Sequence, residues 1–318
     1  MSVVVTGAAG FLGSAVVQAL LRRGDAVVGI DRREQAPRPG LLALTADLLD
    51  GNDAVEDALM RAHTVIHLAA RPGVRDSGPD VARLRHRDNV LATSRVLALV
   101  PRDVPLLVTS SSSVYGGATS GPSRESDPLR PRGGYARSKV EVEHLCRRRL
   151  EKGGVTIIAR PFTVVGEGQR PDMALSRWLA AAAAGQPLRI FGSLARTRDL
   201  VDVRAAARAL IALAGKGAPG VVNVGTGVGH SLQEMVDAVA GAVGRRVRVS
   251  MEPAAAEEVP DSLADVDRLR RLAGFVPRTD LPAVVARQFA AFGHPLASGV
   301  GPCPQLRLPE HANALAEL

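Results

Sequence analysis

Short runs of apolar, β-branched residues alternate along most of the chain with longer stretches in which apolar residues recur every three or four positions. The first run, 3–5, leads into a glycine-rich turn and then into apolar residues at helical spacing from Phe11 to Leu20. The same succession of strand and helix repeats as far as residue 160. Strands that alternate with helices are typical of a doubly wound parallel sheet, so we predict an α/β fold of the Rossmann type.

The expected elements fall into two groups. Before residue 160 we expect strands at 3–5, 26–30, 41–45, 64–68, 105–109 and 155–160, and helices at 11–20, 53–62, 80–99 and 135–152. Beyond it we expect a helix at 171–184, a strand at 188–191, a turn back to the sheet at 198–203, a helix at 203–214, a strand at 221–224, and further segments at 231–243, 247–251 and 280–292. We therefore expect a nucleotide-binding domain (1–168 and 194–228), a smaller interleaved α/β domain for substrate (169–193 and 229–295) and a loose tail (296–318).

The composition is that of a protein with a sizeable core. Hydrophobic residues make up 46% and charged residues 23% of the 318 residues, which excludes a disordered chain. No apolar run reaches the roughly 18 residues of a membrane span, and no basic segment precedes an apolar stretch at the N-terminus, as in a signal peptide. Cys146 and Cys303 make no disulfide framework. We expect a cytoplasmic protein.

The net charge of +8 comes almost entirely from arginine, because only Lys139, Lys152 and Lys216 are lysines. The arginines are scattered and aromatic residues are only 3%, too few for the stacking surfaces that bind single-stranded nucleic acid. The charge is better suited to an anionic small molecule. We expect no nucleic-acid partner, no membrane partner and no metal site.

A Gly-x-x-Gly-x-x-Gly spacing over 7–13 follows the first expected strand. Such a turn lets the backbone approach a pyrophosphate, and the next helix offers N–H donors at its positive end. Asp31 ends the second strand 18 residues beyond Gly13, where an acid can accept hydrogen bonds from ribose hydroxyls and repel a 2′-phosphate. We expect NAD as cofactor; NADP stays open because two arginines follow Asp31. Asp47 would meet the adenine or be a solvated loop residue.

Tyr135 and Lys139 are four residues apart in an expected helix, so that the phenol and the ammonium share one face. A cation beside a phenol, aided by an oxidised nicotinamide, lowers its pKa from about 10 toward neutrality and makes it a usable base. A solvent-facing pair is the alternative. The chain has only two tyrosines, the other being Tyr115.

A row of serines, 110–113, follows the strand expected at 105–109. Ligands bind at the carboxyl ends of parallel strands, so we expect hydroxyl donors that face a ligand rather than a flexible linker.

Together these motifs resemble the extended short-chain dehydrogenase/reductases, in particular the NAD-dependent nucleotide-sugar epimerase/dehydratase group. The resemblance rests on 6–13, Ser111, Tyr135 and Lys139 and covers about residues 1–292. Further motifs that resemble this group are 67–70, 89–90 and 198–201. Within the group, 73–75, 162–166 and 169–174 are similar to UDP-hexuronate 4-epimerases. The chain is also expected to be a homodimer in which the helices at 80–99 and 135–152 pair, with apolar surface from Ala92, Val96, Leu97, Val140 and Leu145.

The resemblance implies the chemistry of the site. Ser111 would bind the sugar O4, Tyr135 would take its proton and Lys139 would hold the ribose while hydride leaves C4 and returns to the other face. Arg170 would grip the C6 carboxylate with its planar fork, which suits two oxygens. Arg198 would meet the diphosphate or form a surface ion pair with Asp199 or Asp202.

The implied contacts are as follows. Those to the cofactor are Gly7, Ala9, Gly10, Phe11, Leu12, Gly13, Asp31, Arg32, Asp47, Leu48, Leu68, Ala69, Ala70, Asn89, Tyr135, Lys139 and Pro161. Those to the UDP-sugar are Gly73, Val74, Arg75, Ser111, Ser112, Ser113, Thr163, Arg170, Met173, Arg189, Arg198 and Asp265.

The serines also separate the chain from its neighbours in the group. Dehydratases carry Thr-Asp-Glu and decarboxylases a Glu where this chain has 111–113, and elimination needs an acid and a base there. The expected reaction is the conversion of UDP-glucuronate to UDP-galacturonate. The alternatives are 4-epimerisation of a neutral UDP-hexose and a non-catalytic NAD-binding protein. The chain departs from the family at Arg71, Val165 and 255–258, which bears on the diphosphate and uridine contacts.

Overall fold

A seven-stranded parallel sheet is the centre of the computed structural model, which describes residues 2–73, 78–118, 121–254, 259 and 261–292. The strand order is β10-β6-β5-β4-β1-β2-β3. The order reverses between β1 and β4, and ligands bind at the carboxyl edge of such a reversal. The strands are β1 (Ser2–Thr6), β2 (Ala26–Asp31), β3 (Leu41–Thr45), β4 (Thr64–His67), β5 (Leu106–Thr109), β6 (Thr156–Pro161) and β10 (Gly220–Val224).

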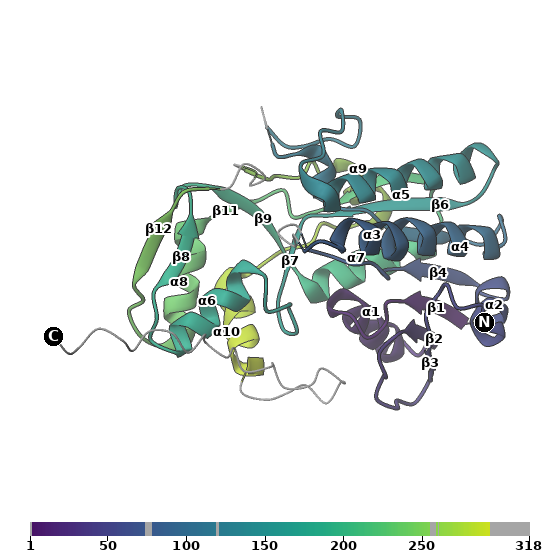
Figure 1. Ribbon diagram of the computed structural model, residues 1–318, viewed down its shortest axis with the longest axis horizontal. Coiled ribbons are helices and arrows are strands. Elements are labelled where there is room, and N and C mark those ends of the chain that lie inside the picture. Colours follow the sequence, from purple (N-terminus) through teal and green to yellow (C-terminus); the bar gives the residue numbers. More distant parts are fainter. Residues whose placement is uncertain (1, 74–77, 119–120, 255–258, 260, 293–318) are drawn as a thin grey trace.

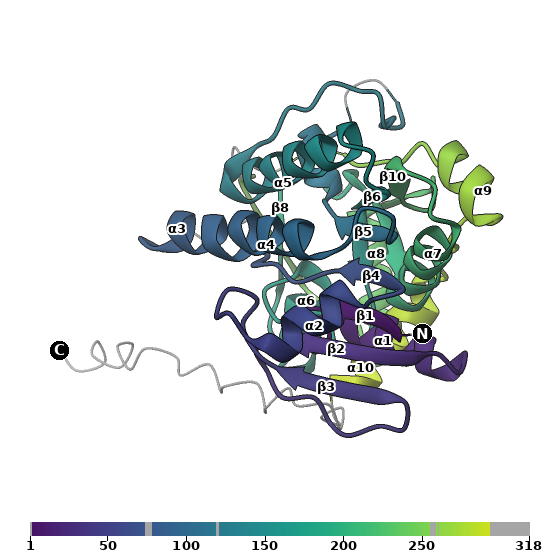
Figure 2. The same ribbon diagram turned by 90° about the vertical axis from the view of Figure 1, so that its right-hand side faces the viewer.

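Helices cover both faces of this sheet, as Figures 1 and 2 show. Side chains alternate between the faces, so that Val3 and Val5 pack on one side and Val4 on the other. One layer consists of α1 (Phe11–Arg22), α7 (Val203–Lys216) and α9 (Asp267–Ala273). The opposite layer consists of α2 (Asp53–Met60), α4 (Ala92–Leu99) and α5 (Gly133–Glu151). The predicted Rossmann-type α/β fold is confirmed.

The helix expected at 80–99 is not uniform. It consists of α3 (Val81–Arg85), a π-helical segment η1 (His86–Leu91) and α4. Single π-helical turns are frequent at functional sites because they rotate side chains out of the regular α-helical order. Here the segment buries Asp88 and Asn89.

A second core lies away from the main sheet. It is built by α6 (Ala174–Ala183), α8 (Leu232–Val243), α10 (Leu281–Phe292) and the parallel pair β8 (Leu188–Phe191) and β12 (Val249–Glu252). Trp178, Leu179, Val239 and Val285 are among its buried residues. Figure 1 shows this group beside the main sheet. The expected division of the chain into two domains stays a prediction.

The expectation that 198–203 turns back into the main sheet was wrong. These residues form β9 (Thr197–Asp202), which pairs with β7 (Thr163–Val165) and β11 (Gly229–Ser231) in a separate three-stranded sheet. Both partner strands have only three residues, too few to show an alternation of polar and apolar positions.

Among the described helices, none is long and apolar enough to cross a membrane. Cys146 is a buried free thiol, and Cys303 and the expected tail lie outside the described residues.

Candidate active site

The turn after β1 is packed so tightly that only glycine fits. A Cβ on Gly13 would lie 1.9 Å from the Gly7 carbonyl oxygen, and one on Gly7 would lie 2.7 Å from the Ala69 nitrogen. Gly7 also has a positive φ of 69°. The turn thus holds the start of α1, which begins at Phe11 and continues through Leu12, against the ends of β1 and β4.

Asp31 is fixed from two sides. Its Oδ2 accepts a hydrogen bond from the Ala9 N–H at 3.0 Å, and its Oδ1 accepts one from the Arg33 N–H at 3.0 Å. The Arg33 guanidinium adds a hydrogen bond of 3.3 Å. The carboxylate is therefore tied to the glycine turn, where a dinucleotide ribose would lie.

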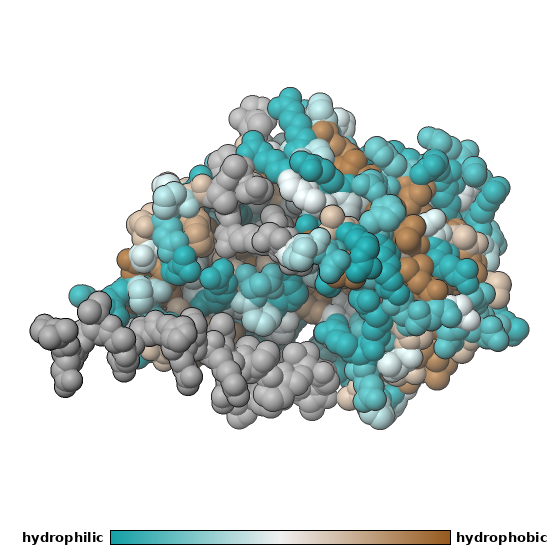
Figure 3. All heavy atoms as spheres, viewed as in Figure 1, coloured by the Kyte–Doolittle hydropathy of each residue, from teal (hydrophilic) through white to brown (hydrophobic). Residues whose placement is uncertain are grey.

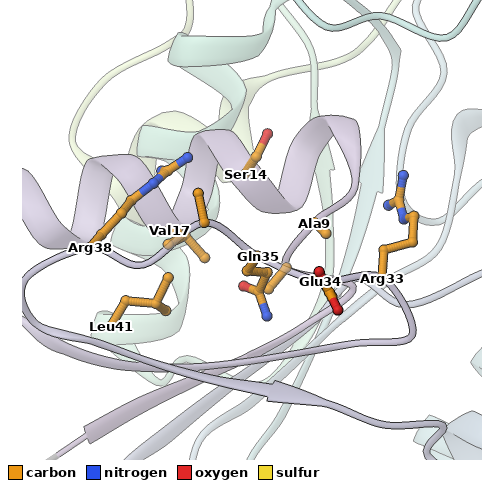
Figure 4. Close-up of a pocket in the computed structure, with 10 residues that line it drawn as sticks. Ala9, Ser14, Val17, Arg33, Glu34, Gln35, Arg38 and Leu41 are labelled. Carbon is orange, nitrogen blue, oxygen red and sulfur yellow. The ribbon is translucent and has the colours of Figure 1, made fainter. Parts of the chain in front are cut away.

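Arg33 also borders a small cavity of about 20 Å³ between α1 and the loop after β2, which Figure 4 shows with Ser14 and Gln35 among its lining residues. This space is enough for about one water molecule, and the arrangement of Asp31 does not depend on it.

Arg32 and Asp47 belong to one network of charges. The Asp47 carboxylate accepts hydrogen bonds from Arg87 Nη1 and from the Leu49 N–H, both at 2.9 Å. Arg32 donates to buried Asp88 at 3.2 and 3.3 Å. Burial raises the pKa of Asp47, but the Leu49 N–H and Arg87 outweigh it and hold that pKa below its usual value. Asp47 is therefore not a free, solvated loop residue; Leu48 beside it is buried.

The segment after β4 is anchored by hydrogen bonds to Thr6 and Asn89. Ala69 donates its N–H to Thr6 Oγ1 at 3.3 Å, and Leu68 and Ala69 pack against the two cores. The Asn89 carboxamide binds both backbone groups of Arg71, at 2.6 and 3.2 Å, and donates to Ser138 at 2.9 Å. Asn89 thus uses its amide to join this segment to the helix that carries Tyr135, and direct contact of Asn89 or Ala70 with the cofactor stays a prediction.

The serine row is an ordered part of the site and not a linker. Ser112 and Ser113 open a 3₁₀ helix, η2 (Ser112–Tyr115), whose N-cap is Ser111. Ser111 Oγ accepts the Ser113 N–H at 3.1 Å, which leaves its own O–H free to donate. Ser113 Oγ is buried and has no hydrogen-bond partner within the described chain. A buried hydroxyl without a partner is costly, so Ser113 is suited to a bound ligand.

Tyr135 and Lys139 lie inside the site and not on the solvent-facing side of α5. The Ser111 side chain is close enough to the Tyr135 phenol to lower its pKa. Lys139, only 3% exposed, donates to the Thr109 carbonyl at 2.9 Å. Burial raises the pKa of Tyr135, while the Ser111 hydrogen bond and the charges of Arg170 and Arg85 oppose that rise. Burial lowers the pKa of Lys139 to about 8. The predicted catalytic residues are thus brought together.

Arg170 reaches the same place from the loop before α6. Its charge acts on the Tyr135 phenol. Its Nε and Nη2 bind both carboxylate oxygens of Asp172, at 2.8 and 2.6 Å, and Nη2 lies 3.9 Å from Met173 Sδ. One side of the fork that was expected to grip a substrate is therefore engaged by Asp172 in this structure, and the Nη1–Nη2 end is the part left for a ligand.

The other expected substrate contacts have partners within the protein. Arg189 forms a bidentate ion pair with Glu252, at 2.5 and 2.7 Å. Arg198 donates to the carbonyls of Thr197 and Val259. Asp265 caps Asp267 and pairs with Arg124 at 3.5 Å. Gly73 accepts from Arg85 through its carbonyl, and Thr163 in β7 pairs with Leu200 in β9. Pro161, which was expected to contact the cofactor, ends β6.

Asp199 does not use its carboxylate in a surface ion pair. The Asp199 carboxylate is buried and accepts hydrogen bonds from Thr226, Gly227 and Ala264. Val74, Arg75 and 255–258 lie outside the described residues.

Sequence reasoning missed Arg85 and Asp172. Arg85 on α3 is buried, donates to the Gly73 carbonyl and acts on the Tyr135 phenol. In a chain with so many arginines, no motif distinguishes it. Asp172 lies within the 169–174 motif, but only the structure shows that it binds Arg170.

The arrangement fits NAD. The glycine turn leaves no side chain between the backbone and a pyrophosphate, Asp31 lies beside it, and Ser111, Ser113, Tyr135 and Lys139 follow at the ends of neighbouring elements. Among the described residues, no group of three His, Cys, Asp or Glu could hold a metal ion.

Comparison with known proteins agrees with this geometry. Residues 3–225 match the NAD dependent epimerase/dehydratase family. The chain belongs to this family. It is therefore an enzyme of the epimerase class, which is a class of isomerases, and its cofactor is NAD.

Members of the family with named substrates are similar over nearly the whole chain. A UDP-glucose 4-epimerase of Mycolicibacterium smegmatis is 32% identical over 92% of this chain and 98% of its own. A probable UDP-glucuronate 4-epimerase of Rhizobium meliloti is 31% identical over 90% and 95%. MoeE5, solved with NAD and either UDP-glucose or UDP-glucuronic acid, is 37% identical with a TM-score of 0.82 over 92% of this chain and 98% of its own.

Proposed function

We propose that this protein is an NAD-dependent 4-epimerase that converts UDP-glucuronate to UDP-galacturonate. The observation that carries the proposal is the position of Arg170, close enough for its charge to act on the phenol of Tyr135. In this proposal, the Arg170 guanidinium would bind the C6 carboxylate of a sugar whose C4 hydroxyl lies at Tyr135. The similarity to a probable UDP-glucuronate 4-epimerase and to MoeE5 with UDP-glucuronic acid supports it.

Tyr135, Ser111 and Lys139 have separate roles in the reaction at C4. Tyr135 takes the proton of the C4 hydroxyl, and Ser111, whose O–H is free to donate, holds the oxygen and stabilises the phenolate. Lys139 supplies a positive charge on the same face of α5. NAD, which the glycine turn and Asp31 would hold, would supply the hydride acceptor and donor for C4. Burial raises the pKa of the Tyr135 phenol, so the phenolate that acts as the base would be scarce near neutral pH. Nearby positive charge, which favours the phenolate, is therefore essential to the step.

Arg170 has a second use if the sugar is a uronate. A 4-keto uronate is a β-keto acid, and it loses CO₂ most readily when the carboxylate bond stands perpendicular to the ketone plane. A guanidinium that holds the carboxylate, charged and in a fixed orientation, disfavours this loss. The carboxylate would bind the Nη1–Nη2 end of the fork while Asp172 keeps the Nε side.

A neutral UDP-hexose is the second candidate, and the Asp172 pair is the observation that favours it. If Asp172 satisfies Arg170 completely, the arginine shapes the loop before α6 and needs no substrate carboxylate. The similarity to a UDP-glucose 4-epimerase and to MoeE5 with UDP-glucose fits this alternative.

Substitution of Arg170 by alanine separates the two. For a uronate substrate we expect kcat/KM with UDP-glucuronate to fall at least roughly tenfold relative to UDP-glucose, since charge-assisted hydrogen bonds are lost. NMR of both sugars after incubation measures this, together with any decarboxylated pentose product. Arg177→Ala, an exposed arginine on α6, is the matched control. An equal loss with both sugars contradicts the uronate proposal.

The proposal includes a homodimer in the cytoplasm. The two-cysteine composition supports that compartment, and the α3–α4 and α5 surface is the proposed interface. Two of the residues expected to supply it, Ala92 and Val96, are buried in this chain's own core because they face the sheet, so that part of the prediction was wrong. Leu97, Val140 and Leu145 are partly buried, and Leu91, 45% exposed, adds apolar surface.

A further inference from the structure

A fully buried carboxylate lies directly behind the proposed catalytic residues. Glu143 follows Lys139 by one helical turn and Tyr135 by two, so all three project from one face of α5. Its side chain is completely inaccessible to solvent. A buried charge is retained only when its surroundings compensate it, so its partners are informative.

Those partners come from three elements. Oε1 of Glu143 accepts hydrogen bonds from Ser110 Oγ at 2.6 Å and from Arg160 Nε at 2.8 Å. Oε2 accepts from Arg160 Nη2 at 2.7 Å and from Arg147 Nη2 at 2.8 Å. Each oxygen therefore has two donors, and Arg160, itself fully buried, binds bidentately.

The bond from Ser110 connects Glu143 to the site. Ser110 immediately precedes Ser111, and Lys139 binds the carbonyl of Thr109 just before it. Consecutive residues at the end of β5 are thus attached to α5 by Lys139 and Glu143. The next residue is Ser111, whose hydroxyl must reach the phenol on that same helix.

Arg160, in β6, links Glu143 to a second group of buried polar side chains. Its Nη1 donates to the Tyr115 hydroxyl at 2.7 Å, and Tyr115 donates to Asn223 Oδ1 at 2.6 Å. Asn223 in turn binds the carbonyls of Ser123 and Asp265. This explains the second tyrosine of the chain, which the proposed reaction does not use.

We infer that Glu143 is a positioning residue for the epimerisation: through Ser110 it fixes Ser111 against the Tyr135 phenol, and it supplies the negative charge that faces Lys139. The inference rests on the proposed 4-epimerase activity but not on the identity of the sugar. The charged and titratable groups around Lys139 are Glu143, Cys146 and Tyr135 on α5 and His67 on β4, with Arg160 of β6 behind Glu143. Within the part of the chain that the structure describes, Glu143 is the only carboxylate among them.

If the Ser110–Glu143 bond only stabilised the fold, its loss should affect kcat no more than the loss of a similar buried bond at the other end of α5. The chain contains such a bond, between Arg149 and Thr156. Arg149, near the end of that helix away from Tyr135, is buried and donates to Thr156 Oγ1 at 2.8 Å and to the carbonyls of Val155 and Pro101. It also ties α5 to β6 through a buried hydroxyl. Thr156→Val is therefore the control for Ser110→Ala.

The experiment compares these two variants as NAD-loaded full chains. We expect Ser110→Ala to lower kcat about tenfold with KM changed by less than about threefold, since small displacements of reacting groups are costly. Thr156→Val should lose thermal stability but keep its kcat. Equal kcat values for wild type and Ser110→Ala, or equal losses in both variants, would overturn the inference.

A second readout needs no turnover. The chain has two tyrosines, so the part of the tyrosinate absorbance that is lost in Tyr135→Phe isolates the titration of Tyr135 from that of Tyr115. Ser110→Ala should move the Tyr135 titration upward by roughly 0.5 on the pH scale, as expected for a weakened hydrogen bond. Thr156→Val should not move it, and Tyr135→Phe identifies the signal.

Glu143→Gln tests the charge. If this variant folds, the alkaline limb of its kcat profile should move to lower pH, because Lys139, whose pKa burial already lowers to about 8, loses the anion that favours its protonated form. An unmoved limb removes the charge part of the inference. If the variant does not fold, the two Ser110→Ala measurements decide. A wild-type chain inactive on both sugars contradicts the proposed function, whereas the tyrosinate titration still tests the position of Ser111.

Discussion

Tyr135 combines two demands that oppose each other. The phenol must be buried to exclude water from the sugar, and burial raises its pKa. It must also lose its proton near neutral pH, which requires positive charge and hydrogen-bond donors nearby. Ser111, Arg170 and Arg85 supply part of this within the chain, and Lys139 lies 6.0 Å from the ring centre.

Tyr135→Phe removes the proton acceptor and leaves the ring packing in place. We expect kcat to fall by 10²–10⁴-fold, roughly what general acid–base catalysis contributes, with NAD still bound. Product formation and the NAD content of the purified variant are the two measurements. Activity close to wild type would mean that another group accepts the C4 proton.

His67 is buried at the end of β4, and both of its ring nitrogens lie against threonine hydroxyls. Its Nδ1 is 2.6 Å from Thr6 Oγ1 and its Nε2 is 3.0 Å from Thr93 Oγ1. Thr93 donates its own proton to the Asn89 carbonyl at 2.5 Å, so Nε2 must carry the imidazole proton. Burial, aided by Lys139, lowers the pKa of His67 to about 3.

This predicts a loss of stability in mild acid. The unfolded chain binds a proton at His67 below about pH 6.5 while the folded chain does not until about pH 3, so the free energy of unfolding falls as the pH drops through this window. The slope should approach about 1.4 kcal/mol per pH unit from this residue. Urea unfolding from pH 7 to 5 measures it, and His67→Asn should have the shallower slope. Parallel slopes would contradict this role.

At the scale of elements, strands and helices with a strong pattern are found close to where the sequence predicts them. β3 and β8 have the expected bounds: β3 is a compact apolar run, and β8 alternates buried Leu188 and Ile190 with exposed Arg189. β7 and β11 were not predicted, since three residues give no periodicity, and β9 was taken as a turn because its partners were unseen. The π-helical segment η1 keeps the polarity pattern of a helix and cannot be recognised from it.

In the site as well, the residues that belong to a sequence motif were predictable, whereas the contacts between individual side chains were not. Ser111, Tyr135 and Lys139 were predictable because their spacing carries the chemistry. The engagement of Arg170 by Asp172 and of Arg189 by Glu252 was not, because each depends on how two side chains meet after folding. A basic chain offers many arginines that could bind an anion, and only the structure shows which already have an acidic partner.

The turn between β1 and α1 gives the sharpest test at this scale. Gly13→Ala would place a Cβ 1.9 Å from the Gly7 carbonyl oxygen, a backbone atom that cannot move without opening the turn. We expect loss of bound NAD and a marked loss of stability. Gly215→Ala on α7, where the Cβ would meet nothing within 4 Å, should stabilise the protein by about 0.5–1 kcal/mol. Thermal unfolding and NAD content distinguish them, and retention of NAD in Gly13→Ala would show that the turn can relax.

At the scale of the whole molecule, helix α5 has one side turned toward the site and one side turned away from it. Figure 3 shows a largely hydrophilic face with smaller hydrophobic patches, in the view in which α3, α4 and α5 lie toward the reader in Figure 1. The site lies at the carboxyl edge of the sheet, and α5 carries Tyr135, Lys139 and Glu143 on the face turned toward it. The opposite face of α5 is therefore free to serve association without disturbing the chemistry.

The last prediction concerns that face. If α3–α4 and α5 pair with a second copy, the protein should run in light scattering at about twice its chain mass of 33.3 kDa at micromolar concentration. Leu91 is 45% exposed on this face, and a charge there would be buried without a partner in the dimer, so Leu91→Glu should shift the equilibrium to monomer. Leu42→Glu is the matched control, because Leu42 is 59% exposed on the edge strand β3, away from these helices. A wild-type monomer, or dimers lost equally in both variants, would contradict the proposed interface.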